Sequence, residues 1–231
     1  NGTTCQLAET KSGARSSYLS HDMGELVESP SYFSASDSSS GHELCANDTS
    51  NSSTWRVADI SSGSGHSNPG NYMEILVGDT LYFSANDGSS GHELWAHDTS
   101  NASTWRVADI RSGGSSSSPG LYMEILVGDT LYFSANDGSS GKELWAHDTS
   151  NASTWRVADI NSGTGSSYPG QYMSILGDTP HLSTCHFLRS HELWAHCTST
   201  ASTTRVADIH SGATTSNPRQ HLTNKVGDPT T

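Results

Sequence analysis

The sequence predicts an all-β protein built from tandem four-stranded antiparallel sheets, and an internal repeat is the main evidence. Residues 78–110 recur as residues 128–160 with one change in 33 positions, His92 against Lys142. The motif Val-Ala-Asp-Ile recurs about every 50 residues and ends at Ile60, Ile110, Ile160 and Ile209. A fixed period of roughly 40–50 residues with several short strands is typical of the blades of a β-propeller. We therefore expect one domain over 1–231, with repeat units near 22–60, 72–110, 122–160 and 172–209.

Each unit is interpreted as four short strands. In the second unit we expect them at 72–77, 81–86, 93–98 and 104–110, because these segments are rich in β-branched or aromatic residues. The links between them contain Gly, Asp, Ser and Asn, which are typical of tight turns. No window shows a sustained helical period, and regularly spaced aromatic residues argue against a disordered chain.

Both faces of the predicted strands carry apolar side chains, with Leu94 and Ala96 on one face and Trp95 on the other. Sheets that pack face to face against two neighbours need this pattern. Four complete units can be counted, with extra strands at 3–10 and 220–226, so the sequence favours a four-bladed β-propeller. A five-bladed ring with a blade shared by the termini is the alternative. A linear stack of sheets is a third interpretation, which is disfavoured because it leaves bare sheet edges.

The segment Glu93-Leu94-Trp95-Ala96-His97-Asp98-Thr99 resembles the ELWxxDGT repeat found in many bacterial and some marine animal secreted proteins. The match recurs at 143–149, and less well at 43–45 and 192–194. It departs from the family where Thr99 follows Asp98 directly, and at Cys197 in the last unit. The resemblance implies a propeller-like fold and no reaction. Small invertebrate propeller lectins are similar by architecture alone.

Charge and composition narrow the function classes. The net charge of −13, from 24 acidic and 11 basic residues, argues against nucleic acid as a partner, because lysines and arginines must replace phosphate counterions. No run approaches the roughly 20 apolar residues of a membrane helix. The first residues lack the features of a signal peptide, as a secreted protein would after its signal is removed. Four cysteines in an acidic, Ser/Thr-rich chain favour a secreted protein with two disulfides.

The cysteine positions suggest a pairing. Cys5 and Cys45 each replace a tryptophan of the repeat, so a bond between them is expected, which leaves Cys185 and Cys197 by elimination. In a regular hairpin these two would lie about 20 Å apart, too far to bond, and Cys5–Cys197 is therefore the alternative.

Candidate glycosylation sites recur at one loop position. Asn51, Asn101 and Asn151 each begin an Asn-X-Ser sequon, and Asn1 and Asn47 also qualify. Such sequons also arise by chance in a Ser-rich chain. Because the repeat unit has been copied, their recurrence is not independent support for glycosylation.

Enzyme signatures are absent from the sequence. It contains no HExxH, CxxC, Gly-X-Ser-X-Gly, P-loop or dinucleotide motif. Two nearly identical units also argue against catalysis, which needs one asymmetric pocket. We therefore expect that the protein is not an enzyme.

Recurring carboxylates suggest calcium. If the last hairpin of each unit is regular, Glu93 faces Asp109 and Glu143 faces Asp159, and a calcium ion would offset their repulsion. The competing interpretation is that Asp87 and Asp109 bond their own turns and that Arg106 pairs with Glu93 or Asp109.

The leading hypothesis is a secreted, multivalent carbohydrate-binding (lectin-like) protein, because copies of a weak site on a rigid ring give avidity for glycans or glycoproteins. Trp105 is a further candidate platform for sugar, although packing between sheets competes for the tryptophans. Alternatives are an extracellular structural or partner-binding propeller, with or without calcium, and a pigment or small-ligand carrier; homo-oligomer formation stays open. The candidate ligand-binding residues are Asn86, Asp87, His92, Glu93, Trp95, Asn136, Asp137, Lys142, Glu143 and Trp145.

Overall fold

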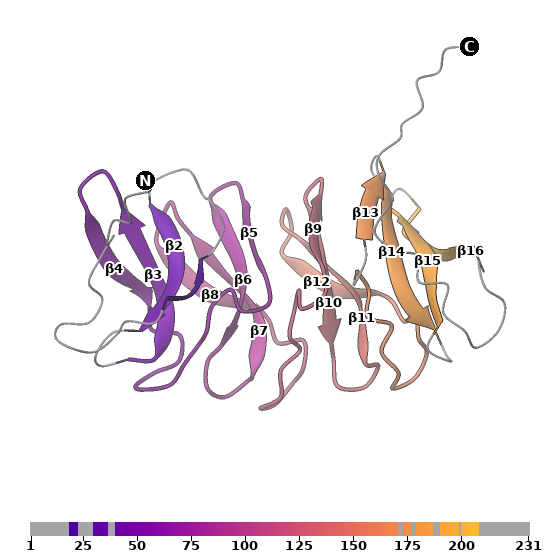
Figure 1. The fold of residues 1–231 in the computed structure, drawn as a ribbon, viewed down its shortest axis with the longest axis horizontal. Coiled ribbons are helices and arrows are strands. Elements are labelled where there is room, and N and C mark those ends of the chain that lie inside the picture. The colour runs from indigo at the N-terminus through magenta and orange to yellow at the C-terminus, as the bar shows by residue number, and fades with distance from the viewer. Residues whose placement is uncertain are drawn as a thin grey trace, which may run out of the picture. The chain divides into compact units, whose positions relative to one another are not determined.

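The structure is a computed structural model that describes residues 19–22, 30–36, 40–170, 173–176, 179–186, 190–198 and 200–207. In these ranges the protein is all-β, and every strand belongs to one of four antiparallel four-stranded sheets. Each sheet is formed by four strands that are consecutive in the sequence (Figure 1). This confirms the prediction of an all-β protein built from four-stranded antiparallel sheets. The extra strands expected at 3–10 and 220–226 lie outside the described residues.

The chain forms two compact units, Asn1–Gly120 and Leu121–Thr231, with two sheets in each. The sheets of the first unit are β1 (Leu19–Asp22), β2 (Ser31–Ser36), β3 (His42–Asp48) and β4 (Ser53–Ala58), then β5 (Glu74–Val77), β6 (Thr80–Asn86), β7 (His92–Asp98) and β8 (Ser103–Ala108). Those of the second unit are β9 (Glu124–Val127), β10 (Thr130–Asn136), β11 (Lys142–Asp148) and β12 (Ser153–Ala158), then β13 (Met173–Leu176), β14 (Thr179–His186), β15 (Ser190–Cys197) and β16 (Ser202–Ala207). No helix long and apolar enough to cross a bilayer occurs in the described ranges.

Tight turns make each sheet a simple meander. Val77 pairs with Thr80 around Gly78, whose φ of 59° is in the region that glycine adopts without strain. Asp98 pairs with Ser103 across a four-residue turn in which Ala102 has a φ of 60°. The strands β5 to β8 lie within two residues of their predicted bounds. The first sheet differs, because β1 ends at Asp22, where the repeat unit was expected to begin.

Within each compact unit, apolar side chains of the two sheets are buried together. In the first unit, Tyr32 and Leu44 of the first sheet pack with Leu81 and Phe83 of the second. The ring of Tyr32 lies 5.3 Å from that of His97. A second cluster in the other unit contains Met123, Tyr132, Leu144, Ala146 and Ile160. Each sheet therefore depends on a neighbour for burial of its apolar side chains.

A β-bulge recurs in the last strand of every sheet, where it pairs with the third strand. In the second sheet, Leu94 pairs with Ala108 while the next residue, Trp95, pairs with Arg106. Val107 is the extra residue on the last strand, so the regular hairpin assumed from the sequence is interrupted. Beyond the bulge the chain leaves the sheet and becomes the connector to the next one.

The connector between the first two sheets is bonded to the sheet before it and to the sheet after it. In the first connector, residues 61–73, Ser67 N donates to His42 O of the first sheet at 2.9 Å. The same residue accepts a hydrogen bond through its own carbonyl from Asn86 N of the second sheet at 3.0 Å. Gly70 N donates to Ser84 O, also of the second sheet, at 2.9 Å. These bonds satisfy backbone groups that a free loop would leave to water.

The register corrects one cysteine pairing. Cys185 pairs with His191 near the start of β15, whereas Cys197 pairs with Ser202 at the end of the same strand. Six residues of strand separate the two positions, about 20 Å, so a Cys185–Cys197 disulfide is excluded. Cys45 is buried at the predicted tryptophan position, opposite Phe33. Cys5 lies outside the described residues, so its bond to Cys45 or Cys197 stays a prediction.

Candidate binding site

Each sheet has two ends, which we name by what lies there. At the connector end, the third strand begins beside the connector that leaves the sheet, and Ser117 N donates to His92 O at 3.1 Å. At the hairpin end the two tight turns meet, and Thr99 N donates to Asp79 O at 2.8 Å. The predicted ligand-binding residues of the loops all lie at the connector end.

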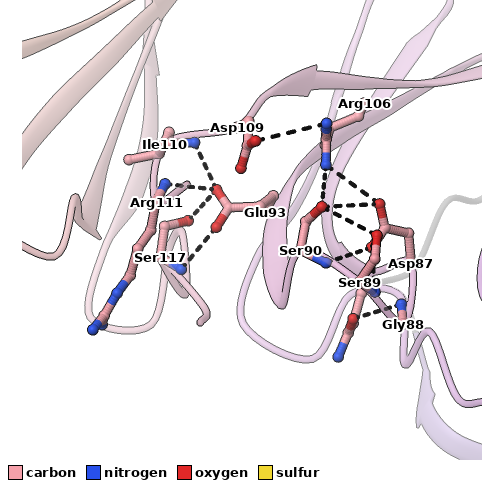
Figure 2. A network of polar contacts seen from close by, with 11 residues as sticks. Asp87, Gly88, Ser89, Ser90, Glu93, Arg106, Asp109, Ile110, Arg111 and Ser117 are labelled. Carbon is pink, nitrogen blue, oxygen red and sulfur yellow. Dashed lines mark hydrogen bonds and ion pairs between the residues drawn. The ribbon is translucent and has the colours of Figure 1, made fainter. Parts of the chain in front are cut away.

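A buried glutamate holds the connector in place. Glu93 has no exposed surface, and the leaving chain donates four hydrogen bonds to its carboxylate (Figure 2). Oε2 accepts from Ile110 N at 2.8 Å and Arg111 N at 3.4 Å. Ser117 donates through its N to Oε1 at 3.0 Å and through its Oγ to Oε2 at 2.8 Å. The glutamate of the Glu-Leu-Trp motif therefore binds the chain itself.

Glu43 and Glu143 hold their own connectors in the same way, and we call Glu43, Glu93 and Glu143 the connector glutamates. Glu143 accepts from Ile160 N at 2.8 Å, Ser167 N at 3.1 Å and Ser167 Oγ at 2.8 Å. Burial raises the pKa of all three carboxyls, hydrogen bonds offset part of the rise, and the pKa of Glu143 reaches about 7. Because Glu93 and Glu143 are inaccessible, we do not retain them as ligand-binding residues.

Asp87 folds its own loop, in agreement with the competing interpretation. Its Oδ1 accepts from Ser89 N at 2.8 Å and Ser90 N at 2.7 Å, and its Oδ2 lies 3.3 Å from Arg106 Nη1 (Figure 2). Burial raises the pKa of Asp87, but the hydrogen bonds from the two serines outweigh it, so the pKa is below its ordinary value. Asp137 repeats this arrangement in the third sheet. These two carboxylates stiffen the loops.

The carboxylate pairs considered for calcium have other partners. The bulge turns Asp109 toward Arg106, with 3.7 Å between Oδ2 and Nη2, while Glu93 faces the connector. Asp159 makes the same contact with Arg156 at 3.9 Å. Within the described ranges, no group of three or more His, Cys, Asp or Glu side chains is placed to hold a metal ion. Calcium therefore stays a prediction without an assigned site.

The tryptophans of the motif serve packing. Trp95 and Trp145 lie on the opposite sheet face from His92 and Lys142, because side chains alternate along a strand. Trp95 packs against the core between the first two sheets. The indole nitrogens of Trp95 and Trp145 are buried without a hydrogen-bond partner. Both tryptophans are half-buried.

A tyrosine that the sequence analysis did not single out lies beside His92 at the connector end. The Tyr72 ring is half-buried and lies 4.9 Å from the His92 ring in a T-shaped contact. Ser118, on the following connector, is close to this pair, because its N donates to His92 O at 3.2 Å. Asn86 pairs with His92 at the end of β6, and its Oδ1 accepts from Gly88 N at 2.8 Å. Burial lowers the pKa of His92, which is therefore neutral at pH 7.

The equivalent cluster of the third sheet has different side chains. The Tyr122 ring lies 5.2 Å from the Tyr168 ring, and Lys142 Nζ lies 5.7 Å from the centre of the Tyr122 ring. Burial and the neighbouring Tyr168 raise the pKa of Tyr122. Asn136 occupies the place of Asn86, opposite Lys142. Two connector-end clusters thus share a tyrosine and an asparagine but differ in charge and aromatic content.

Differences between repeats are concentrated at this end. In the connector 111–123, the positions that differ from its copies at 61–73 and 161–173 are all partly or fully exposed. The shared Ser117, Pro119, Gly120 and Met123 are all buried. Comparing the connectors by eye would have revealed this signal in the sequence. The differing positions are 61/111/161, 64/114/164, 65/115/165, 66/116/166, 68/118/168 and 71/121/171.

The hairpin end, by contrast, is identical in the second and third repeats and carries the predicted glycosylation sites. Asn51, Asn101 and Asn151 are exposed at the tips of the hairpins. Two residues after each sequon serine stands a tryptophan, of which Trp105 is 40% exposed. Trp55 and Trp155 are exposed to about the same extent, at 42% and 40%.

No family model and no curated protein sequence matches the chain. Among solved structures, it is similar to a puromycin hydrolase S511A mutant complexed with PGG, with a TM-score of 0.54 and 12% identity over 79% of this chain and 27% of that chain. It is also similar to a puromycin-hydrolyzing peptidase of Mycobacterium tuberculosis, with a TM-score of 0.53 and 10% identity over 84% of this chain and 29% of that chain. TolB from Acinetobacter baumannii matches with a TM-score of 0.46 and 13% identity, over 76% of this chain and 40% of that chain.

The fold is β-propeller-like. At this level of identity the similarity shows the fold alone. The chain spans between about a quarter and two fifths of the length of the structures that it matches. The activities named for those proteins are therefore not transferred to it.

Proposed function

We propose that this protein is a secreted, multivalent carbohydrate-binding protein with a four-bladed propeller, whose binding sites lie at the connector ends. The observation that carries the proposal is the recurrence of a half-buried tyrosine beside variable side chains on a fixed backbone. Four sheets of four strands support four blades. The five-bladed ring remains the alternative.

The chemistry of these clusters suits sugars. A sugar ring has an apolar C–H face, which packs on an aromatic ring, and hydroxyl groups, which need planar polar partners. Tyr72 and Tyr122 supply the rings. Asn86 and Asn136 supply amides whose oxygens are already fixed by Gly88 N and Gly138 N. The rigid loops lower the entropy that binding would otherwise cost.

The sites are related but not identical, which refines the expectation of identical copies. His92 is buried and neutral beside Tyr72, whereas Lys142 places a positive charge beside Tyr122. We therefore expect the Tyr72 site to prefer neutral sugars and the Tyr122 site to prefer acidic ones. Linked weak sites of this kind gain affinity for a surface that displays many glycans.

A glycan array probed with the full-length protein, with and without a chelator, tests the proposal. Tyr72→Ala and Tyr122→Ala should each weaken binding, and Lys142→His should reduce only the binding of acidic glycans. Trp105→Thr is the matched control, because it removes an exposed aromatic ring from the hairpin end and introduces the residue found at the equivalent Thr204. The proposal fails if no glycan binds. It also fails at this location if Trp105→Thr abolishes binding and Tyr72→Ala does not.

A further inference from the structure

We propose that Asn51, Asn101 and Asn151 carry N-linked glycans whose first sugars cover the exposed faces of Trp55, Trp105 and Trp155. This inference concerns the hairpin end and is independent of the binding sites proposed at the connector end. It assigns both a modification and the group that covers three otherwise exposed rings.

The hairpin holds the asparagine in a defined position. Asn101 Oδ1 accepts from Ser103 N at 2.9 Å, and its Nδ2 donates to Asp98 Oδ2 at 2.6 Å. The same two contacts recur at Asn51 and Asn151. Nδ2 has two hydrogens, so one is replaced on glycosylation while the other is available to the aspartate. The modification is therefore compatible with the observed hairpin.

The tryptophan is within reach of a glycan on that asparagine. Ser103 and Trp105 lie two residues apart on β8, so their side chains share a face of the strand and are about 7 Å apart. Trp105 pairs with Ala96, whose small side chain leaves the indole partly uncovered. Exposed indole faces attract the C–H face of a pyranose, as in sugar-binding sites.

The fourth repeat supplies an independent observation. Its hairpin keeps the pairing of Cys197 with Ser202, and Ala201 keeps a positive φ of 49°. Yet Thr200 replaces the sequon asparagine, and Thr204 replaces the tryptophan. Neither residue is therefore required to form the hairpin, and the two are lost together. The buried tryptophan of the motif, by contrast, is retained in this repeat as Trp194.

In the partial copy at the N-terminus, the sequon and the tryptophan are not lost together. It keeps a sequon at Asn1 while Cys5 stands in the tryptophan position, and it lies outside the described residues. The inference is therefore made for the three complete hairpins alone.

The covalent step is an ordinary glycosyl transfer. Nδ2 of the asparagine attacks C1 of the first sugar of a lipid-linked oligosaccharide pyrophosphate. The new bond joins Nδ2 to C1, the bond from C1 to the pyrophosphate oxygen breaks, and the Nδ2 proton leaves to a base of the transferase. No oxidant or reductant is involved.

The test uses full-length protein secreted from a eukaryotic host. Tryptic peptides are weighed before and after treatment with peptide N-glycosidase, and trypsin separates the hairpins because Arg56, Arg106 and Arg156 follow the three tryptophans. Glycan mass is expected on all three asparagines. Absence of glycan from all three would overturn the inference.

Coverage of the rings is measured by hydroxyl-radical labelling, resolved by residue through fragmentation of each peptide, because Trp95 and Trp105 lie in one tryptic peptide. Trp105 and Trp155 should be labelled less in the glycosylated protein than after enzymatic removal of the glycans, whereas Trp95 should not change. Ser103→Ala removes a sequon but keeps the backbone donor to Asn101, and Ser103→Thr keeps the sequon. The first variant should raise labelling of Trp105 alone, and the second should leave it unchanged. Equal labelling with and without glycan would overturn the docking on tryptophan.

Discussion

The connector end and the hairpin end of a sheet are built from the same repeat, but they tolerate change very differently. At the connector end, buried bonds to the connector glutamates fix the backbone, and the exposed positions around Tyr72 and Tyr122 vary. At the hairpin end, the second and third repeats are identical in sequence and hydrogen bonding. We infer that different ligands are met at the first end, whereas one common modification is displayed at the second.

The largest expected effect follows from removing a connector glutamate. Glu143→Ala removes the acceptor of Ile160 N and leaves a cavity at a fully buried position, whereas Ser167 N and Oγ keep their bonds to Lys142 O. The lost acceptor costs about 1–3 kcal/mol and the cavity about 2 kcal/mol or more. The free energy of unfolding, measured by urea denaturation, should fall by about 3 kcal/mol or more. Asp159→Ala is the control, because it removes only a partly exposed contact with Arg156 and should cost less than about 1 kcal/mol. Equal losses in the two variants would contradict a special role for the buried carboxylate.

The second effect is a pH dependence specific to the same residue. The pKa of Glu143 rises from its ordinary 4.5 to about 7 in the folded protein. Its contribution to stability is therefore fully present below about pH 4.5 and is lost as the pH rises to about 7, a change of about 3 kcal/mol. Urea denaturation from pH 4 to 8 should show this slope in the wild-type protein relative to Glu143→Gln.

The comparison with Glu143→Gln is needed because buried histidines titrate with the opposite sign. Burial lowers the pKa of three histidines, His97, His147 and His196. Their contribution to the free energy of unfolding is therefore lost as the pH falls below the pKa of a free histidine. These groups are common to both proteins and cancel in the difference. A difference profile that is flat across pH 4 to 8 would show that Glu143 does not titrate there.

A smaller effect is expected at the hairpin end. Asn151→Thr introduces the residue found at the equivalent Thr200, where the hairpin keeps its register. It removes two exposed side-chain contacts, to Asp148 and from Ser153 N, and should lower the free energy of unfolding by less than about 1 kcal/mol. A loss as large as that of Glu143→Ala would show that the asparagine serves the fold, and would remove the reason to regard it as a displayed group.

The smallest effect on stability is expected at the variable positions of the connector end. Lys142→His with Tyr168→Ser gives the third sheet the side chains found at His92 and Ser118. The free energy of unfolding should change by less than about 1 kcal/mol, because both side chains are partly exposed. Glycan binding should shift toward that of the second sheet. Unchanged glycan binding together with a large loss of stability would show that Lys142 and Tyr168 serve the fold and not binding.

The strands and their antiparallel order could be predicted from the sequence, because turn residues bound short segments that are apolar on both faces. The start of β5 and the end of β8 could not be predicted from the sequence. Tyr72 and Met73 continue the strand pattern, but Tyr72 N donates to Ser84 Oγ and Met73 O accepts from Ser84 N, so both belong to the connector. The loop role of Asp87 was anticipated, since Asp before Gly commonly bonds its own turn.

The predicted pairing of Glu93 with Asp109 was wrong for a specific physical reason. The prediction assumed a regular hairpin, and no residue type marks in advance the bulge at Val107, opposite Leu94 and Trp95. One extra residue moved Asp109 toward Arg106 and left Glu93 to the connector. The tyrosine clusters were missed because Tyr72 and His92 are 20 residues apart and only the fold brings their rings together.

The connector has a consequence for how such a protein can grow. All three connectors are tied to the sheet before them by the same bonds from a serine to a connector glutamate, so each repeat ends in the same way. A duplicated block of about 50 residues would therefore join without remodelling either side, as the near-identity of residues 78–110 and 128–160 suggests has already happened. After such a duplication, the exposed side chains of one copy could diverge to bind another ligand, while its buried residues stayed unchanged.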